Sequence, residues 1–420
     1  MNFISTRNPA IARTLSAAIQ EGLAADGGLF VPESMPEVDS DCFPPELSYP
    51  TFASRLLTHF FNTDPLASKL DAMCQRAFNF PVPLKQLDHH LFVLELFHGP
   101  TSSFKDIGAR FLAECLNETA DGQKTILVAT SGDTGSAVAS AFHGKLHYRA
   151  VILYPDGQVS ANQAHQMTCW DENIFAFAVD GNFDHCQQLV KSAFFDPEWQ
   201  AARLSSANSI NIGRLLPQMT YYAWCSLQFY RTHGVKPGFI IPSGNLGNAT
   251  AAYWAKAMGF PIREIQLTTN ANRVLPDYLS SAHYEPKPGI KTIANAMDVG
   301  DPSNLERLNH LFNQFETLKK QVKAMSVTDD AIRKTIVQIY KHHQYISCPH
   351  TATAFHAHSQ LDDQAWIVVA TADPCKFTEI IEPLINVQVP LAPQLKQLLD
   401  MPNKIRRVSA SLAAIKKLLP

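Results

Sequence analysis

The chain has 420 residues, of which 46% are hydrophobic and 17% are charged, so it can bury two or three cores and is too apolar to be disordered. Lys and Arg number 35 against 38 Asp and Glu, and the net charge of −3 gives no broad basic field for nucleic acid or an anionic membrane. A small-molecule ligand is the better expectation.

Signals for export, membrane insertion and metal binding are missing from the sequence. No apolar run approaches the roughly 18 residues of a membrane span, and the first residues lack a long apolar block followed by a cleavage site. The eight cysteines include no CxxC pair, so they predict neither a zinc site nor a disulfide framework. We therefore expect a cytoplasmic protein without a metal site, either a monomer or a homodimer.

Three parts follow one another along the chain. Residues 1–90 are rich in turn residues and predict an N-terminal α+β unit. Residues 91–385 alternate short β-branched and aromatic runs with helical patterns, which predicts βαβ units, and we expect a ligand-binding core there. Residues 386–420 predict a helical tail with Lys and Arg toward its end.

Four units of the core place loops where a ligand could bind. A helix begins near Phe104, with apolar residues from Ile107 to Leu116 on one stripe. Strands are predicted at 125–130, 238–241 and 365–370, and each runs through a loop into a helix. In open α/β sheets, ligands bind at the carboxyl ends of strands and the amino ends of helices.

The loop Ser243-Gly244-Asn245-Leu246-Gly247-Asn248 has the composition of an anion cup. Its glycines let the backbone approach a ligand, and the following helix offers unpaired N–H groups and a positive dipole end. It matches neither a P-loop nor a dinucleotide fingerprint. The alternative is a purely structural turn between strand and helix.

The loop from Ser131 to Gly135 repeats this design one unit earlier. Backbone amides and hydroxyls at a helix start suit the carboxylate of an amino acid. The alternative is a capping turn in which Ser131 or Thr134 only satisfies helix amides.

Lys105 stands at the start of its predicted helix, where the dipole disfavours a positive charge. That position lowers the pKa of an amine, as a Schiff-base lysine requires. The alternative is an ordinary solvated lysine.

Several motifs together carry a family resemblance. FHGPTSSFKD from Phe97, SGDTGSA from Ser131 and SGNLGN from Ser243 resemble threonine synthases in order and spacing. STRN, DGGLFVPE, NSIN, NAMDVGDPSN and PHTA, which begin at Ser5, Asp26, Asn208, Asn295 and Pro349, support the resemblance. It covers about the first 385 residues. The family is one of pyridoxal-phosphate (PLP) enzymes of fold type II, the tryptophan-synthase-β-like group, with two open parallel or mixed sheets flanked by helices.

The resemblance implies a role for each matching residue toward PLP. Lys105 would carry the cofactor as a Schiff base and act as the catalytic base. The cofactor phosphate would bind at Ser243, Gly244, Asn245, Leu246, Gly247 and Asn248. Asp133 would lie beside the phenolic oxygen, and Thr371 would face the pyridine nitrogen. A hydroxyl does not keep that nitrogen protonated, so the imine carries more of the electron sink.

The implied reaction converts O-phospho-L-homoserine and water to L-threonine and phosphate, and it requires a second phosphate site. The predicted substrate-binding residues are Ser131, Gly132, Thr134, Ser103, Arg110, Asn208, Asn211 and Arg214. Arg110 as a surface residue and Arg214 in a salt bridge are the alternatives. His98 and His350 are predicted to stabilise loops rather than to act as bases. Cys348 departs from the family pattern, which has an acidic residue before PHTA.

Two other functions stay open from the sequence. A threonine or serine dehydratase-like eliminase would share the fold, the lysine and the glycine loop. The long N-terminal unit, the Asp of SGDTG and NAMDVGDPSN favour threonine synthase. A non-catalytic homologue that binds PLP or a phosphorylated ligand is the second, and the retained Lys105 argues against it.

Overall fold

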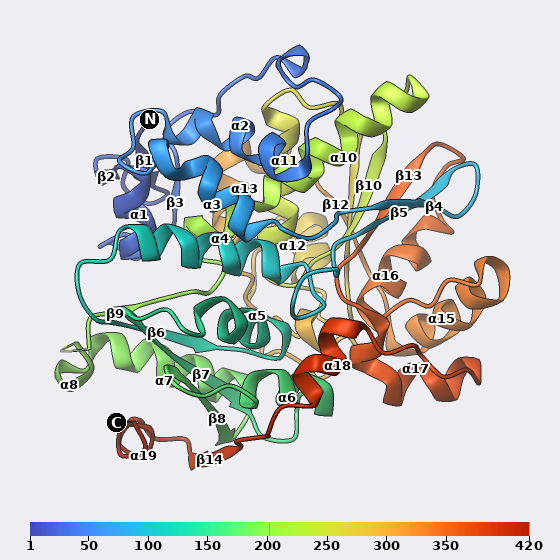
Figure 1. Cartoon of the computed structure of the whole chain (residues 1–420). Coiled ribbons are helices and arrows are strands. Elements are labelled where there is room, and N and C mark those ends of the chain that lie inside the picture. The colour runs from blue at the N-terminus through green and yellow to red at the C-terminus, as the bar shows by residue number, and fades with distance from the viewer. Residues whose placement is uncertain (201, 420) are drawn as a thin grey trace.

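The computed structural model describes residues 1–200 and 202–419, which form three sheets and the helices that cover them. In Figure 1 the blue N-terminal unit lies at the top, and a lobe of teal and green elements lies below it. The N-terminal unit has a small antiparallel sheet in the order β2-β1-β3, with helices beside it. Its elements are β1 (Phe3–Ser5), β2 (Ala12–Arg13), β3 (Phe30–Pro32), α1 (Leu15–Glu21), α2 (Tyr49–Phe61) and α3 (Leu70–Ala77).

The large lobe is built on a six-stranded sheet in the order β12-β11-β10-β13-β5-β4. All neighbouring strands are parallel except β4, which runs antiparallel to β5. Both faces of its central part are covered, since alternate residues of β5, β10 and β13 enter different cores. The strands are β4 (Leu84–Gln86), β5 (Leu91–Glu95), β10 (Gly238–Pro242), β11 (Ile265–Thr269), β12 (Lys323–Ser326) and β13 (Trp366–Ala370).

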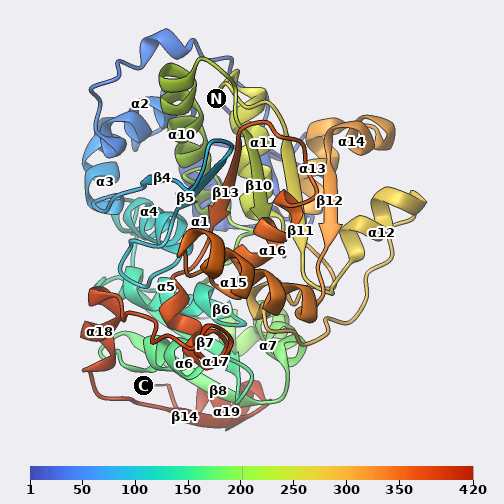
Figure 2. The same ribbon diagram turned by 90° about the vertical axis from the view of Figure 1, so that its right-hand side faces the viewer.

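Helices α10 and α11 share one core of the large lobe, and α16 packs on β10 and β13 from the other face. Figure 2 shows β10, β11, β12 and β13 side by side above the smaller lobe. The helices of this lobe are α9 (Ile212–Leu215), α10 (Gln218–His233), α11 (Gly247–Ala257), α12 (Val274–Ser281), α13 (Leu305–Phe312), α14 (Phe315–Gln321), α15 (Asp329–His343), α16 (Pro349–His358) and α17 (Thr378–Ile385), with the short turns η3 (Asn295–Met297) and η4 (Pro374–Phe377).

The small lobe holds a five-stranded parallel sheet in the order β14-β8-β7-β6-β9. Helices α4 and α5 pack together, α5 lies on β7, and α7 lies on β6. Its elements are β6 (Lys124–Ala129), β7 (Tyr148–Pro155), β8 (Ile174–Asp180), β9 (Leu204–Ser205), β14 (Arg406–Ser409), α4 (Lys105–Glu118), α5 (Asp133–Phe142), α6 (Ala161–Thr168), α7 (Phe183–Phe195), α8 (Pro197–Gln200), α18 (Pro393–Leu399) and α19 (Leu412–Lys416).

The predicted sheets flanked by helices and the N-terminal α+β unit are confirmed, and the predicted strands lie within one residue of β6, β10 and β13. The division into parts at residues 90 and 385 stays a prediction. In the structure the large sheet takes up residues on both sides of residue 90, because β4 pairs with β5. In the described part of the chain, no helix combines the length and the apolarity that crossing a bilayer would need.

The C-terminal tail is helical only in part: α18 and α19 lie within the predicted helical tail of residues 386–420, but a strand separates them. Residues 406–409 form strand β14, which pairs with β8 at the edge of the small sheet, and only the short helix α19 follows. The reason is the open edge of β8, which offers backbone partners and a pocket for Val408.

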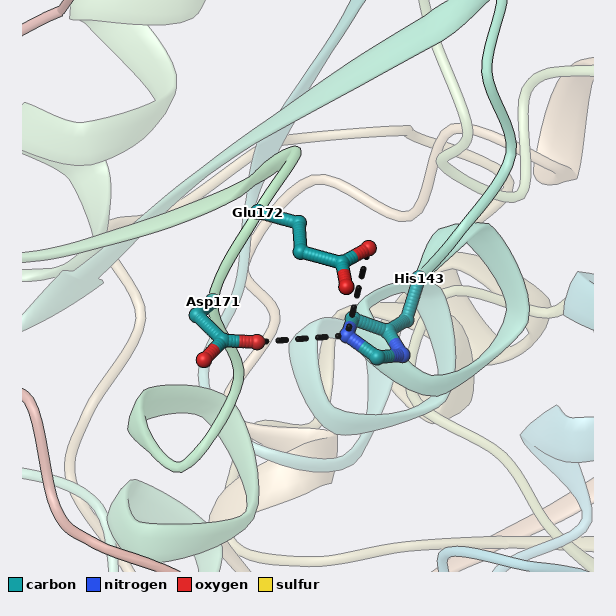
Figure 3. Close-up of side chains that lie close together, drawn as sticks. All are labelled: His143, Asp171 and Glu172. Atoms are coloured by element: carbon teal, nitrogen blue, oxygen red, sulfur yellow. Dashed lines mark ion pairs between the residues drawn. The ribbon is translucent and has the colours of Figure 1, made fainter.

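A cluster of charges helps to hold the tail. Figure 3 shows His143 at the end of α5 with its Nε2 directed between the carboxylates of Asp171 and Glu172, at 3.5 and 4.0 Å. Lys404 of the tail binds the other oxygen of Asp171 at 2.8 Å. These residue types can ligate metals, but the two acidic side chains are more than half exposed and none of the three lines the cavity described below. The ion pairs account for the cluster.

Candidate active site

One cavity of about 1580 Å³ lies between the two lobes and the N-terminal unit. Lys105, three residues of one loop (131, 133 and 134) and the loop 243–248 all form its wall, although they are far apart in the sequence. Helices α4, α5 and α11 begin at this wall, so their positive ends converge on it. The cavity is large enough for a cofactor and a substrate together.

Lys105 is the first residue of α4, and backbone contacts with the loop after β13 hold this turn. The Phe104 amide donates to the Thr371 carbonyl at 2.9 Å, and Ser103 pairs with Ala372. Burial lowers the pKa of Lys105 to about 8; the charges of Lys376 and Arg214 act in the same direction and Asp133 opposes them. Burial is therefore the first cause of the lowered pKa of Lys105.

The loop 243–248 is a cup of backbone N–H groups. Leu246 adopts a left-handed conformation with φ 59°, which turns the chain sharply into α11 at Gly247. The first amide to bond back within this turn is that of Thr250, to the Leu246 carbonyl, so among the described residues the N–H groups of the turn before it find no backbone acceptor. Gly244 touches the turn η3, where a Cβ would come within 2.7 Å of the Met297 Cα. The turn is therefore packed closely against η3, and residues 243–248 line the cavity.

Side chains around the cup fix its remaining donors. The Asn248 Oδ1 accepts hydrogen bonds from the hydroxyls of Tyr221 and Tyr222 at 2.5 and 2.7 Å. The buried Nδ2 of Asn248 then has no partner in the described chain, and Asn248 lines the cavity. An orphaned donor of this kind indicates a ligand. Asn245 is held by Ser209 and by the Ser303 amide.

The loop 131–135 is tied down by Thr130. The Thr130 hydroxyl accepts the amides of Gly132 and Gly135 at 3.0 Å, whereas neither Ser131 nor Thr134 caps α5. The capping alternative for those two hydroxyls is therefore wrong, and both line the cavity. Gly132 has φ 145°, and a Cβ there would collide with the side chain of Gln163.

The structure brings together all the residues predicted for the cofactor, since each of them lines the cavity. They are Lys105, Asp133, Thr371 and residues 243–248. Thr371 directly follows β13, at the end of the sheet that faces the cavity.

The residues predicted for the substrate divide into two groups. Arg214, Asn208, Ser131 and Thr134 line the cavity. Arg214 is buried, its Nη1 donates to the Ala207 carbonyl, and its Nε has no partner among the described residues. Burial lowers the pKa of Arg214 to about 10, with Asp106 acting in the opposite direction.

The other four residues do not line the cavity, so the structure gives them no contact with a ligand there. The Arg110 guanidinium turns to the end of α3 and donates to the carbonyls of Arg76 and Ala77 and to Asn79. The side-chain amide of Asn211 is fully engaged in the fold: its Nδ2 donates to the carbonyls of Ile19 and Ser206, and its Oδ1 accepts the Gly213 amide. Ser103 and Gly132 lie just behind the wall, and both are absent from its lining.

Two residues beside Lys105 gain importance in the structure. Lys376 is fully buried and pairs with Asp133 at 2.7 Å; nothing in the sequence pointed to it, because its partner lies 243 positions away. His350 lines the cavity, and its Nε2 accepts the Ala296 amide at 3.0 Å. Burial lowers the pKa of His350 to about 4, so it is neutral and supports the turn, as predicted.

Cys348, where the sequence departs from the expected pattern, is the N-cap of α16. Its Sγ accepts the Thr351 amide at 3.5 Å, and burial raises the pKa of the thiol to about 11. An acidic residue at an N-cap would make the same contact with a charge. The departure therefore concerns the helix end and not the chemistry of the cavity.

Comparisons with known proteins cover nearly the whole chain. A family model described as pyridoxal-phosphate dependent enzyme matches residues 75–371, and models of the threonine synthase N terminus and C-terminal region match residues 2–78 and 351–419. The threonine synthase of Haemophilus influenzae is 39% identical over 413 residues, which are 96% of this chain and 95% of that protein. The chain belongs to the threonine synthase family.

Solved threonine synthases share the entire fold. The structure of the Escherichia coli threonine synthase superposes with a TM-score of 0.93 at 36% identity and covers 100% of this chain and 99% of its own. A PLP-bound threonine synthase from Brucella melitensis superposes with a TM-score of 0.91 at 32% identity, covering 99% and 98%. The fold is therefore PLP fold type II, pyridoxal 5'-phosphate is the cofactor, and the protein is a lyase of threonine biosynthesis.

Proposed function

We propose that this threonine synthase acts on O-phospho-L-homoserine and water and releases L-threonine and phosphate. The observation that carries the proposal is that one cavity contains three features: the weakly basic amine of Lys105, the cup of N–H groups at 243–248 and the buried guanidinium of Arg214. The cup at 243–248 supplies one phosphate site. Arg214 supplies the positive charge for a second, which a phosphorylated amino acid needs and a hydroxyl amino acid does not.

The residues of the cavity fit PLP. The open N–H groups before Thr250 and the unpartnered Nδ2 of Asn248 are donors for its phosphate. Lys105 supplies the amine that holds its aldehyde carbon. Thr371 lines the cavity, and its hydroxyl would face the pyridine nitrogen. When bound, PLP supplies an electron-withdrawing imine that stabilises negative charge at the substrate α-carbon.

Lys105 also moves the protons in this proposal. Burial lowers the pKa of Lys105 to about 8, so its Nζ, when not bonded to the cofactor, would be able to take the proton from the substrate Cα. The amides around Ser131 and Thr134 hold the substrate carboxylate at the start of α5. Arg214 would hold the leaving phosphate through its charge and its unpartnered Nε, whereas Asn208 lines the same cavity and donates its Nδ2 to the Ala129 carbonyl.

The test compares Lys105→Ala with Lys85→Ala, an exposed lysine outside the cavity. Phosphate release from O-phosphohomoserine is expected to fall by about three orders of magnitude or more in Lys105→Ala, since it loses both the cofactor link and the base, and to stay unchanged in Lys85→Ala. Borohydride reduction of the holoenzyme should label Lys105 in peptide mapping.

The same assay separates the alternatives. Ammonia release from serine or threonine without phosphate release from O-phosphohomoserine would support the dehydratase-like eliminase and contradict the proposal. A chain that binds PLP but turns over none of these amino acids would be a non-catalytic homologue.

A further inference from the structure

A buried ion pair lies directly behind the proposed cofactor amine. Lys376 in the turn η4 is 0% exposed and Asp133 at the start of α5 is 3% exposed, and the Lys376 Nζ lies 2.7 Å from the Asp133 Oδ1. The Nζ also donates to the Thr101 carbonyl at 2.8 Å, four residues before Lys105. The pair thus connects the large lobe, the small lobe and the loop that carries Lys105.

Gln163 of α6 completes this arrangement. Its Nε2 donates to the same Asp133 Oδ1 at 2.9 Å, and its Oε1 accepts the Asn295 amide group and the Ser160 amide. Gln163 is therefore fixed as the donor to Asp133. In the described chain no hydrogen bond reaches the Asp133 Oδ2, and Asp133 lines the cavity. One oxygen is held by the fold and the other is left for the site.

The charges that face Lys105 come from four elements. They are Asp133 of α5, Lys376 of η4 and Arg214 of α9, together with His350 of α16, which is neutral because burial lowers its pKa to about 4. Asp106 points away from the cavity and is bonded to the Thr101 amide and hydroxyl. Asp133 is thus the carboxylate that would draw a proton onto the Lys105 amine, and Lys376 is the cation bound to it.

We propose that Lys376 is a positioning residue whose ammonium group neutralises Asp133 and so keeps the amine of Lys105 uncharged and free to react. This rests on the proposed function only in taking Lys105 as the reacting amine. A carboxylate beside a lysine favours the charged ammonium form, and a cation bound to that carboxylate cancels the attraction. The pair also holds the Asp133 Oδ2 at a set place on the cavity wall.

The experiment measures the ionisation of Lys105 in the full-length chain freed of PLP. Trace acetylation by acetic anhydride across pH, followed by peptide mapping, gives the midpoint at which Lys105 becomes reactive. The variants are Lys376→Met, Asp133→Asn and the double variant, with circular dichroism as the check of folding. The wild-type midpoint is expected near pH 8.

The single variants should move this midpoint in opposite directions. Lys376→Met leaves the Asp133 carboxylate without its cation and should raise the labelling midpoint of Lys105 by about one pH unit. Below the midpoint this corresponds to a labelling rate that is about tenfold lower. Asp133→Asn leaves a bare ammonium and should lower it by a similar amount. The double variant has neither charge and should return to within a few tenths of the wild-type value. A purely structural role would not produce opposite shifts and their cancellation.

Two outcomes would overturn the inference: a folded Lys376→Met variant with the wild-type midpoint, or an Asp133→Asn variant whose midpoint does not fall. Lys376→Met can fail to fold, because removing one partner of a buried ion pair is strongly destabilising. In that case the midpoints of Asp133→Asn and of the double variant still test the inference. The labelling needs neither PLP nor substrate. The two tests are therefore independent. If the proposed function is wrong, the phosphate-release assay will show it, and the labelling midpoints can still be measured.

Discussion

Arg214 and Arg110 show at the scale of single residues how the fold selects one of two similar side chains. Both lie close to Lys105 in the structure, Arg110 one turn along the same helix and Arg214 across from Gly108. Gly108 has no side chain, and a Cβ there would meet the Arg214 backbone at 2.7 Å and its Nε at 3.0 Å. This close approach allows Arg214 to reach the cavity wall, whereas Arg110 caps α3.

We predict that Arg214→Gln raises the KM for O-phosphohomoserine by about 10- to 100-fold, since a hydrogen bond to a charged group contributes roughly 1.5–3 kcal/mol. Arg110→Ala is the matched control and should leave KM unchanged while it lowers the melting temperature, because α3 loses its capping bonds. Steady-state phosphate release at varied substrate gives both values. An Arg214→Gln enzyme with the wild-type KM would remove this residue from the substrate site.

The sequence predicted residue types more reliably than side-chain directions. Lys105 and the two glycine loops were correctly placed in one cavity, because each motif sits at the start of a helix. Arg110 and Asn211 were indistinguishable from Arg214 and Asn208, since all four are polar residues near those motifs. Lys376 could not be found, because its significance lies in a contact with Asp133 that only the folded chain brings about.

At the scale of elements, the turn before α11 depends on the absence of a side chain at Gly244. A Cβ at this position would come within 2.7 Å of the Met297 Cα and 3.1 Å of the Ala296 carbonyl oxygen, and backbone atoms cannot move aside cheaply. The turn η3 and the cup would have to separate. Because η3 also carries the Ala296 amide that binds His350, this movement would spread along the cavity wall.

Gly244→Ala is therefore expected to weaken PLP binding by about tenfold or more, through displacement of the N–H groups that we propose for the phosphate. Gly234→Ala is the control. Gly234 ends α10 with φ 72°, and apart from its chain neighbours no described residue comes within 4 Å of its Cβ position, so this change should cost about 1–2 kcal/mol of stability and leave PLP affinity unchanged. Equilibrium dialysis of the two variants against PLP makes the comparison, and equal affinities would contradict this account of the cup.

At the scale of the whole molecule, the C-terminal tail belongs to the core of the small lobe. Strand β14 extends the sheet beyond β8, and Val408 and Ile415 enter the same apolar cluster as Leu127 and Val151 of the central strands. The sequence pattern did not reveal this, because a four-residue strand at a sheet edge takes its partner from a segment more than 200 residues earlier. Strand β6 was predictable, since most of it is a continuously apolar run.

We predict that Ile415→Ala destabilises the small lobe by about 2–5 kcal/mol, the usual effect of removing a fully buried aliphatic side chain. Ile415 is 0% exposed, whereas Leu418 of the same tail is 48% exposed, so Leu418→Ala should change stability by less than about 0.5 kcal/mol. Urea unfolding followed by circular dichroism measures both midpoints. Because the small-lobe sheet also carries the loop 131–135, PLP should leave Ile415→Ala at a lower urea concentration than the wild type. If the tail did not contribute to the core, both variants would unfold at the same urea midpoint. PLP would then leave Ile415→Ala at the same urea concentration as it leaves the wild type.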